Sequence, residues 1–317
     1  LYINNGWKSL PIGKAKYGIM LREDGIVFDD GTTSRLSKNR YFMTTTTTNA
    51  AAVLSQMELY LQLHWSYLDV KIASVTDTWS VLSIAGPKSR EVLRAVTENL
   101  DVSNDALRHL EVREANIGGV PCRIARISYS GELAYEIYSP ADYGYLVWDR
   151  IIKAGKIYDI TPYGTEALAI MRIEKGHIAA GEMDGRTTIE DLGFGRMASE
   201  SKEYIGRSMM KREGLISKHR PQFVGLIPAD GKTRLRAGSI LVASPKLKPP
   251  VPKLGHISSS AYLSPTLGHP IALGFVRGGL ERKTKTIWAM FPLRNEVIEV
   301  QVVDPVFWDK KGQRLHA

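Results

Sequence analysis

MLREDGIVFDDGTTSRL, residues 20–36, contains the hairpin signal on which the fold of the N-terminal part of the chain depends. KYGIML, 16–21, is typical of a strand, REDG, 22–25, of a tight turn with Gly25 at its sharpest point, and IVFDD, 26–30, of the return strand. This second strand is expected to end in two adjacent carboxylates, Asp29 and Asp30. The stretch therefore predicts an antiparallel start to the fold, with the two aspartates serving either as a polar turn or in chemistry.

The elements that follow the hairpin alternate between strands and helices. RYFMTTTTT, 40–48, is a β-rich run, because threonine is β-branched and favours strands. In order, we then expect a helix at 49–65, a strand at 77–86, a helix at 87–100, two strands joined at Gly118–Gly119 within 109–131, a strand at 133–139, and helices at 140–155 and 164–176. This order lacks strict parallel βαβ units, which favours an α+β fold over a doubly wound α/β fold.

The composition changes near residue 218, where we place a domain boundary. FVGLIP, AGSILV, LGHISSSAY, IALGFV, TIWAMF and VIEVQVV are short strands separated by turns rich in glycine and proline. This spacing predicts a small all-β barrel or sandwich. The segment 244–253 is expected to form an exposed loop within it.

Length and composition limit the class of protein. A chain of 317 residues is expected to form two or three domains. Its single cysteine, Cys122, permits no internal disulfide, which fits a reducing compartment, and we expect a cytoplasmic location. No apolar run is long enough to span a bilayer, and the N-terminus lacks the layout of a signal peptide, so no membrane association is expected.

The formal net charge of +9 is compatible with nucleic acid, a membrane surface or an anionic small molecule. The densest basic stretch, 206–222, is best explained as a solvated helix face and loop. Because no zinc-finger spacing, RNA-binding signature or basic strand with interleaved aromatic residues is present, we expect no nucleic-acid partner. An anionic ligand explains the charge at least as well.

Several familiar motifs are absent or out of context. GFGRMA, 193–198, matches G-x-G-x-x-A, but the acidic TTIED stretch precedes it where a dinucleotide site requires a strand, so we reject it. The histidines show no metal-ligand spacing, and we expect no metal site. Ser130 does not lie in a G-x-S-x-G nucleophile elbow.

Two carboxylate positions remain as candidates for chemistry. Adjacent residues of a strand point to opposite faces, so one of Asp29 and Asp30 can face solvent while the other faces inward. An inward carboxylate needs a partner or has a raised pKa, and either property suits proton handling. Taken alone, the segment favours a turn-initiating aspartate before Gly31. Glu136 is the second position: alternation along its strand places it on one face with Tyr138, and it is either simply solvated or part of a polar-aromatic pocket wall.

KYGIMLREDGIVFDDG, MTTTT, SYSGELAYEIYSPADYG, LGHISSSAYLSPTLGHPIALGFV and DPVFWDKKGQRLHA together resemble the aminomethyltransferase family, which includes the T-protein of the glycine cleavage system. The similarity covers nearly the whole chain and, through REDGIVFDDG and DPVFWD, points to the branch formed by the C-terminal folate-binding part of sarcosine oxidase α subunits. The resemblance implies a cloverleaf-like α+β fold with a C-terminal β barrel. The implied domains are 1–77 plus 182–217, a folate-site domain that is discontinuous and incomplete at its N-terminus; 78–181, a second α+β domain; and 218–317, the barrel.

The same resemblance implies tetrahydrofolate as cofactor and a flavin-binding β subunit among the partners. The implied function is capture of the imine or formaldehyde from sarcosine oxidation as 5,10-methylenetetrahydrofolate. Asp30 then takes the place of the catalytic aspartate beside the reactive folate nitrogens, and Asp29 is left as a turn residue. The positions matched to cofactor-binding residues are Tyr17, Thr44, Tyr129, Glu136 and His177.

The chain also departs from the family pattern. Leu168 stands where glycine-cleavage proteins carry an arginine, and His177 where many relatives carry tyrosine. The match begins late, so we expect an N-terminally truncated or separately encoded piece, with a weakened folate site and a sheet edge that needs cover. A non-catalytic module that binds folate or packs against other subunits, and a free-standing aminomethyltransferase, therefore remain alternatives.

Overall fold

The computed structural model describes residues 1–246 and 250–317, and the segment predicted as an exposed loop, 244–253, lies partly outside them. The chain separates into two compact units. The barrel unit consists of Leu1–Asn5, Ile19–Phe28 and Tyr163–Lys311, and the sheet unit of Gly6–Gly18, Asp29–Pro162 and Gly312–Ala317. The predicted division into three domains is a different description of the chain and stays a prediction.

The predicted hairpin is present and extends into a three-stranded sheet. Its strands β1 (Ala15–Leu21), β2 (Val27–Ser37) and β3 (Arg40–Met43) lie in the order β1-β2-β3. The prediction that the second strand ends at Asp30 is wrong, because β2 continues to Ser37 and pairs with β3. The predicted run 40–48 is too long: the strand stops at Met43, a 3-10 turn follows at Thr47–Asn49, and α1 occupies Ala50–Leu63.

Gly31 lies inside β2 for a reason that the sequence did not reveal. A Cβ atom on this residue would lie 2.0 Å from the backbone oxygen of Thr44, so only glycine allows the segment after β3 to approach the strand so closely. The backbone N–H of Thr44 donates to the carbonyl of Thr32 at 2.8 Å, which fixes this approach. Gly31 is therefore a packing glycine and not the corner of a turn.

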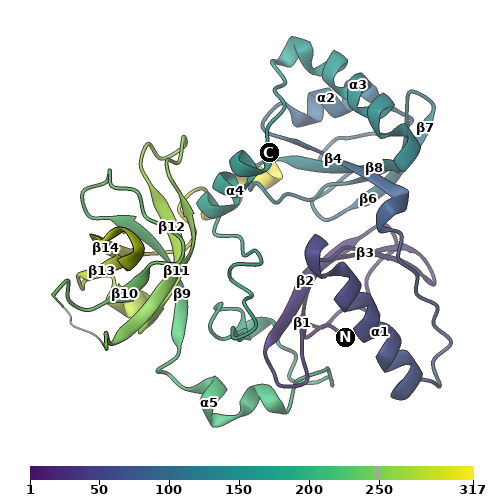
Figure 1. Ribbon diagram of the computed structural model, residues 1–317. Helices are drawn as coiled ribbons and strands as arrows, with labels where there is room; N and C mark the ends of the chain where they lie inside the picture. The colour runs from purple at the N-terminus through teal and green to yellow at the C-terminus, as the bar shows by residue number, and fades with distance from the viewer. Residues whose placement is uncertain (247–249) are drawn as a thin grey trace. The chain divides into compact units, whose positions relative to one another are not determined.

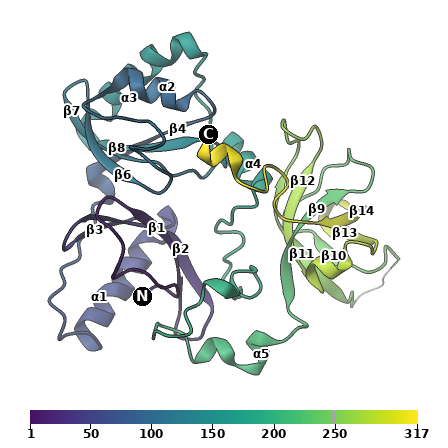
Figure 2. The ribbon, with the colours of Figure 1, turned by 180° about the vertical axis from the view of Figure 1, so that it is seen from behind.

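A five-stranded antiparallel sheet lies within the sheet unit. Its strands are β4 (Trp79–Ala85), β5 (Thr97–Glu98), β6 (Val112–Ile117), β7 (Val120–Ala125) and β8 (Ala134–Pro140), in the order β4-β8-β7-β6-β5. The predicted turn at Gly118–Gly119 joins β6 to β7, and both glycines have the positive φ angles, 58° and 78°, that a two-residue hairpin loop needs. Helices α2 (Ser89–Val96) and α3 (Gly144–Gly155) lie over one face of this sheet (Figure 1, Figure 2).

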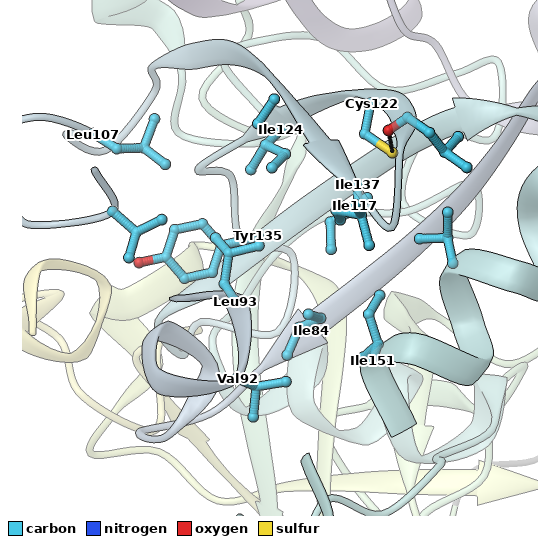
Figure 3. Close-up of a cluster of buried hydrophobic side chains, with 14 of the residues drawn as sticks. Ile84, Val92, Leu93, Leu107, Ile117, Cys122, Ile124, Tyr135, Ile137 and Ile151 are labelled. Carbon is cyan, nitrogen blue, oxygen red and sulfur yellow. Dashed lines mark hydrogen bonds between the residues drawn. The ribbon is translucent and has the colours of Figure 1, made fainter. Parts of the chain in front are cut away.

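The hydrophobic core of the sheet unit lies between that face and the two helices (Figure 3). Tyr135 and Ile137 of β8 point into it, on the side of the strand opposite to Glu136 and Tyr138, and both are fully buried. Cys122 belongs to the same core. Burial raises the pKa of its thiol to about 11, so this side chain acts as a small apolar residue and not as a nucleophile.

The C-terminal part forms a closed barrel. Of the two predicted architectures, a barrel and a sandwich, the barrel is therefore the one present. Its strands are β9 (Pro221–Pro228), β10 (Ile240–Val242), β11 (Lys253–Ala261), β12 (Ile271–Arg277), β13 (Ile287–Phe291) and β14 (Glu296–Val303), in the order β10-β11-β12-β9-β14-β13. The inward-facing apolar side chains of these strands fill its interior. All described strand pairings in the chain are antiparallel, which confirms the α+β prediction.

A buried ion pair ties α4 (Thr165–Glu174) to the barrel. Arg172 Nη1 lies 2.9 Å from Glu182 Oε2, and Arg172 Nη2 donates to the hydroxyl of Ser259 on β11 at 2.5 Å. The other oxygen of Glu182 accepts hydrogen bonds from the hydroxyls of Ser258 and Ser259. Because Glu182 is fully buried, its charge depends on these partners.

The short helix α5 (Glu213–Ile216) follows in the basic segment before the barrel. Within the described residues, no helix combines the length and the apolar character that crossing a membrane requires.

Candidate functional site

Tyr17 and Asp30 form the centre of the candidate site. The hydroxyl of Tyr17 on β1 donates a hydrogen bond of 2.6 Å to Asp30 Oδ2 on β2. The two aspartates point to opposite sides of the strand, as expected. Asp29 is the buried one, with 1% of its surface exposed, and Asp30 is half-buried. The interpretation of Asp29 as a turn residue is wrong, because it lies within a strand and inside the protein.

The surroundings of Asp30 alter its acidity. Burial raises the pKa of its carboxyl group from 3.8 to about 6, because the charged form loses solvation. The hydrogen bond from Tyr17 lowers this pKa, and the negative charge of Asp29 raises it further. Burial and the neighbouring carboxylate also raise the pKa of Tyr17, which therefore stays a hydrogen-bond donor. Asp30 can thus gain and lose a proton close to neutral pH, which suits a general base.

Thr44 and Tyr129 lie in the same unit close to this pair. The hydroxyl oxygens of Thr44 and Thr32 are 2.9 Å apart, which places Thr44 beside the strand that carries Asp30. Tyr129, on the loop between β7 and β8, is 39% exposed and interacts electrostatically with Tyr17. Four of the six predicted site residues are therefore gathered around the hairpin strands.

Glu136 lies on β8, on the face of the five-stranded sheet opposite the helices. Its Oε2 accepts a hydrogen bond from the hydroxyl of Tyr138, and burial raises its pKa. Its other oxygen accepts no hydrogen bond from any described residue. Val81 on β4 pairs with Tyr138 on β8. Because the side chain of Val81 is 50% exposed, this part of the sheet face is open. A carboxylate with one unused acceptor on an open face can bind N–H donors of a ligand.

Arg123 is part of this region and was missed by the sequence analysis. It pairs with Tyr138 across β7 and β8, is only 4% exposed, and lies 4.6 Å from the ring centroid of Phe42 and 4.8 Å from that of Trp79. Phe42 in turn packs edge-on against Tyr138, with centroids 5.2 Å apart. These contacts link β3, which leads to Thr44, with the strand of Glu136. The signal in the sequence was an arginine inside the apolar run VPCRIA.

Two donor atoms of Arg123, Nε and Nη1, are buried without a hydrogen-bond partner among the described residues. The nearest carboxylate, that of Glu114, is 3.7 Å away and mostly exposed. Two aromatic faces therefore contact the guanidinium group in addition to this long ion pair with an exposed carboxylate. Its positive charge also lowers the pKa of Tyr138, against the effect of burial.

His177 belongs to the barrel unit and not to the unit of the other five residues. It follows the end of α4, where its N–H donates to the carbonyl of Arg172 and its own carbonyl accepts from Arg172 Nη1 at 3.1 Å. Leu168, the departure from the family pattern, is a half-buried residue of α4. The role of His177 in binding stays a prediction.

The structure describes the segment of the rejected dinucleotide motif and the side chains that could ligate a metal. Gly193–Ala198 contains a 3-10 turn at Gly195–Met197 and has neither a strand before it nor an α-helix after it, which confirms the rejection. Within 1–246 and 250–317, no three histidine, cysteine, aspartate or glutamate side chains gather as a metal site would require.

Comparisons with known proteins agree with this architecture. The family model "GCVT N-terminal domain" matches residues 1–202, and "Glycine cleavage T-protein C-terminal barrel domain" matches 222–309. The aminomethyltransferase of Streptomyces coelicolor is 30% identical over 269 residues, which cover 83% of this chain and 68% of that protein. The crystal structure of the glycine cleavage system aminomethyltransferase T from Bartonella henselae has a TM-score of 0.78 at 20% identity, covering 95% of this chain and 78% of that one.

A second group of relatives is longer. Sarcosine oxidase subunit alpha of Rhizobium meliloti is 44% identical over 315 residues, and the same subunit of Corynebacterium sp. (strain P-1) is 39% identical over 314. In both cases the match covers 98% of this chain and 32% of the relative. The chain therefore spans about a third of the length of these subunits.

Proposed function

The chain belongs to the glycine cleavage T-protein family, and from this premise we propose that it forms the tetrahydrofolate-dependent one-carbon transfer part of a sarcosine-oxidase-like complex. In this proposal a flavin on a partner β subunit oxidises the amine. The present chain captures the resulting imine or formaldehyde and yields 5,10-methylenetetrahydrofolate. The 44% identity to a sarcosine oxidase α subunit along almost the whole chain supports this branch of the family.

The observation that carries the proposal is the Tyr17–Asp30 pair. A carboxylate with a pKa of about 6 and a protonated phenol hydrogen-bonded to it make a proton acceptor of suitable strength at neutral pH. Tetrahydrofolate, when bound, would supply the two nitrogens that hold the one-carbon unit. Asp30 would accept the proton released as the carbon–nitrogen bond forms, and Tyr17 would hold the carboxylate in place.

The neighbouring residues fit a pterin. Its ring edge presents N–H donors, and a carboxylate such as Glu136, with one oxygen unused, can accept them. Tyr129 offers an aromatic face for a flat ring, and Thr44 offers a hydroxyl group beside Thr32 on the strand that carries Asp30. His177 is proposed as a further contact of the pterin. Binding of the flat ring between such groups would also exclude water from Asp30.

A free-standing aminomethyltransferase is the second candidate function. It is supported by the match to the Streptomyces coelicolor enzyme, of which the aligned residues cover 68%. The two functions share the folate site and differ in the donor, which is a sarcosine-oxidising partner in the first and an aminomethyl group on a carrier in the second. Supplying each donor to the same preparation with tetrahydrofolate separates them.

The test of the proposed chemistry uses the purified chain, tetrahydrofolate and formaldehyde. Formation of methylenetetrahydrofolate is followed above the uncatalysed rate for the wild type and for Asp30→Ala, with the exposed Asp105→Ala as a matched control. We expect Asp30→Ala to bind tetrahydrofolate within about threefold of the wild type and to lose about 100-fold or more in rate, as is typical for loss of a general base. Unchanged transfer by Asp30→Ala would remove the role given to this residue.

A further inference from the structure

A cleft of about 270 Å³ lies within the barrel unit, well away in the sequence from the hairpin residues discussed above. It is bounded by the outer surface of β11 and β12 and by the segment 184–191, with Arg220 and Pro221 at the start of the barrel closing one side. Its volume lies slightly below the roughly 300–1,000 Å³ that small-molecule sites occupy, so it fits only a small ligand. Nothing in the proposed one-carbon transfer uses it.

The floor of the cleft is largely apolar. His256 on β11 pairs directly with Phe275 on β12, and their rings are stacked with centroids 5.5 Å apart and planes at 22°. Neither side chain belongs to the barrel interior. Burial lowers the pKa of His256, which keeps its imidazole neutral and therefore suited to stacking. Leu254 and Pro221 extend the apolar surface beside the two rings.

The charges around the cleft do not balance. Its two carboxylates are already engaged: Asp191 binds Arg220 through both oxygens, and Asp184 binds Arg186. Two further cations line the cleft, Lys253 and Arg277, and neither has an ion-pair partner in the part of the chain that the structure describes.

These two cations sit together. Because Gly255 pairs with Val276, Lys253 and Arg277 lie at the same end of neighbouring strands. Both side chains are exposed, and the charge of Lys253 reaches the cleft strongly enough to contribute to the lowered pKa of His256. The mouth of the cleft thus has a local excess of positive charge, which attracts anions.

We propose that this cleft binds a small planar aromatic anion, with its ring against His256 and Phe275 and its acidic group between Lys253 and Arg277. The ring alone would find an apolar floor but leave both cations unneutralised. An inorganic anion alone would find the cations but leave the floor covered only by water. A ligand that has both parts uses both features, and its acidic group can be a carboxylate or a phosphate.

The experiment measures binding of two probes to the full chain by calorimetry or ligand-observed NMR. Isophthalate tests the carboxylate arm and AMP the phosphate arm, with isophthalamide, adenosine and inorganic phosphate as counterparts that lack one feature. The double variant Lys253→Gln/Arg277→Gln removes the cations, and His256→Ala removes part of the floor. Lys285→Gln/Arg294→Gln is the matched control, since it changes the net charge equally at exposed barrel positions outside the cleft.

We expect at least one probe to bind with a submillimolar Kd and its counterparts to bind about tenfold more weakly or not at all. The cation variant and His256→Ala should each weaken binding about tenfold, and the matched control should not. Absence of binding by both probes, or equal loss in the cation variant and its control, would overturn the proposal. Asp30→Ala should bind the probes as the wild type does, so this result is independent of the folate proposal.

Discussion

Replacing Asp30 by asparagine should make the fold more stable at neutral pH. In the folded chain the pKa of Asp30 is about 6, against 3.8 for the group in its ordinary state. Each pKa unit corresponds to about 1.4 kcal/mol, so keeping this carboxylate charged inside the protein costs at most about 3 kcal/mol. Asparagine has the same shape and can still accept the hydrogen bond from Tyr17, but it has no charge to desolvate.

The sign of the pH dependence follows from linkage. Because the pKa of Asp30 is raised on folding, the folded wild type binds more protons than the unfolded chain between pH 4 and pH 6. The contribution of Asp30 to the free energy of unfolding is therefore fully present below about pH 4 and is lost as the pH rises through about 6. The difference between Asp30→Asn and the wild type should grow over this range and stay constant above pH 7.

The assay is urea-induced unfolding of both proteins at several pH values, with Asp105→Asn as an exposed control. We expect the free energy of unfolding of Asp30→Asn to exceed that of the wild type by up to about 3 kcal/mol at pH 8 and by little below pH 4. The variant should lose transfer activity at every pH. A gain that does not change with pH would mean that it does not come from the ionisation of Asp30, and a loss of stability at pH 8 would mean that the charge of Asp30 stabilises the fold. Either result would refute the reasoning.

Three further substitutions test the packing around the site and the barrel by the same unfolding measurement. Gly31→Ala should cost at least about 2 kcal/mol, because the new Cβ would overlap the backbone oxygen of Thr44; an unchanged midpoint would contradict this. Glu182→Gln should cost about 3–5 kcal/mol by leaving the buried charge of Arg172 uncompensated, and a cost below 1 kcal/mol would show that the pair is dispensable. Arg123→Met should stay within about 1 kcal/mol of the wild type, because it removes two buried unpaired donors along with the cation–π contacts.

The sequence predicted the local elements well where periodicity and turn chemistry agree. The strands of the barrel and the turn at Gly118–Gly119 carry such signals, and the structure has them. Helix α4 ends at Glu174, two residues before Gly176, whose positive φ angle of 70° fits a residue that terminates a helix. Only the family resemblance linked Tyr17 with Asp30, because a hydrogen bond between neighbouring strands has no signature in either strand alone.

The misses share a physical cause, which is that burial and close approach depend on the folded chain. Gly31 resembled a turn residue in the sequence. The actual requirement for glycine is the close approach of Thr44, which lies thirteen positions later in the sequence. Asp29 was interpreted as a turn residue, whereas in the folded chain it lies within β2 and is buried. Arg123 was passed over because a single charge in a strand is usually exposed, whereas here Phe42 and Trp79 from two other strands enclose it.

Titration of tetrahydrofolate into the wild type and into Glu136→Gln tests the central claim most directly. Glutamine has the size of glutamate but replaces one acceptor oxygen with a donor, and a charged hydrogen bond to a ligand contributes about 1.5–3 kcal/mol. We predict micromolar binding by the wild type and a loss of about tenfold or more in Glu136→Gln. The unfolding midpoint of this variant should not fall, because burial raises the pKa of the Glu136 carboxyl group and the amide has no charge to desolvate. No heat of binding at high micromolar tetrahydrofolate, or equal affinity of the two proteins, would contradict the assignment of this site to folate.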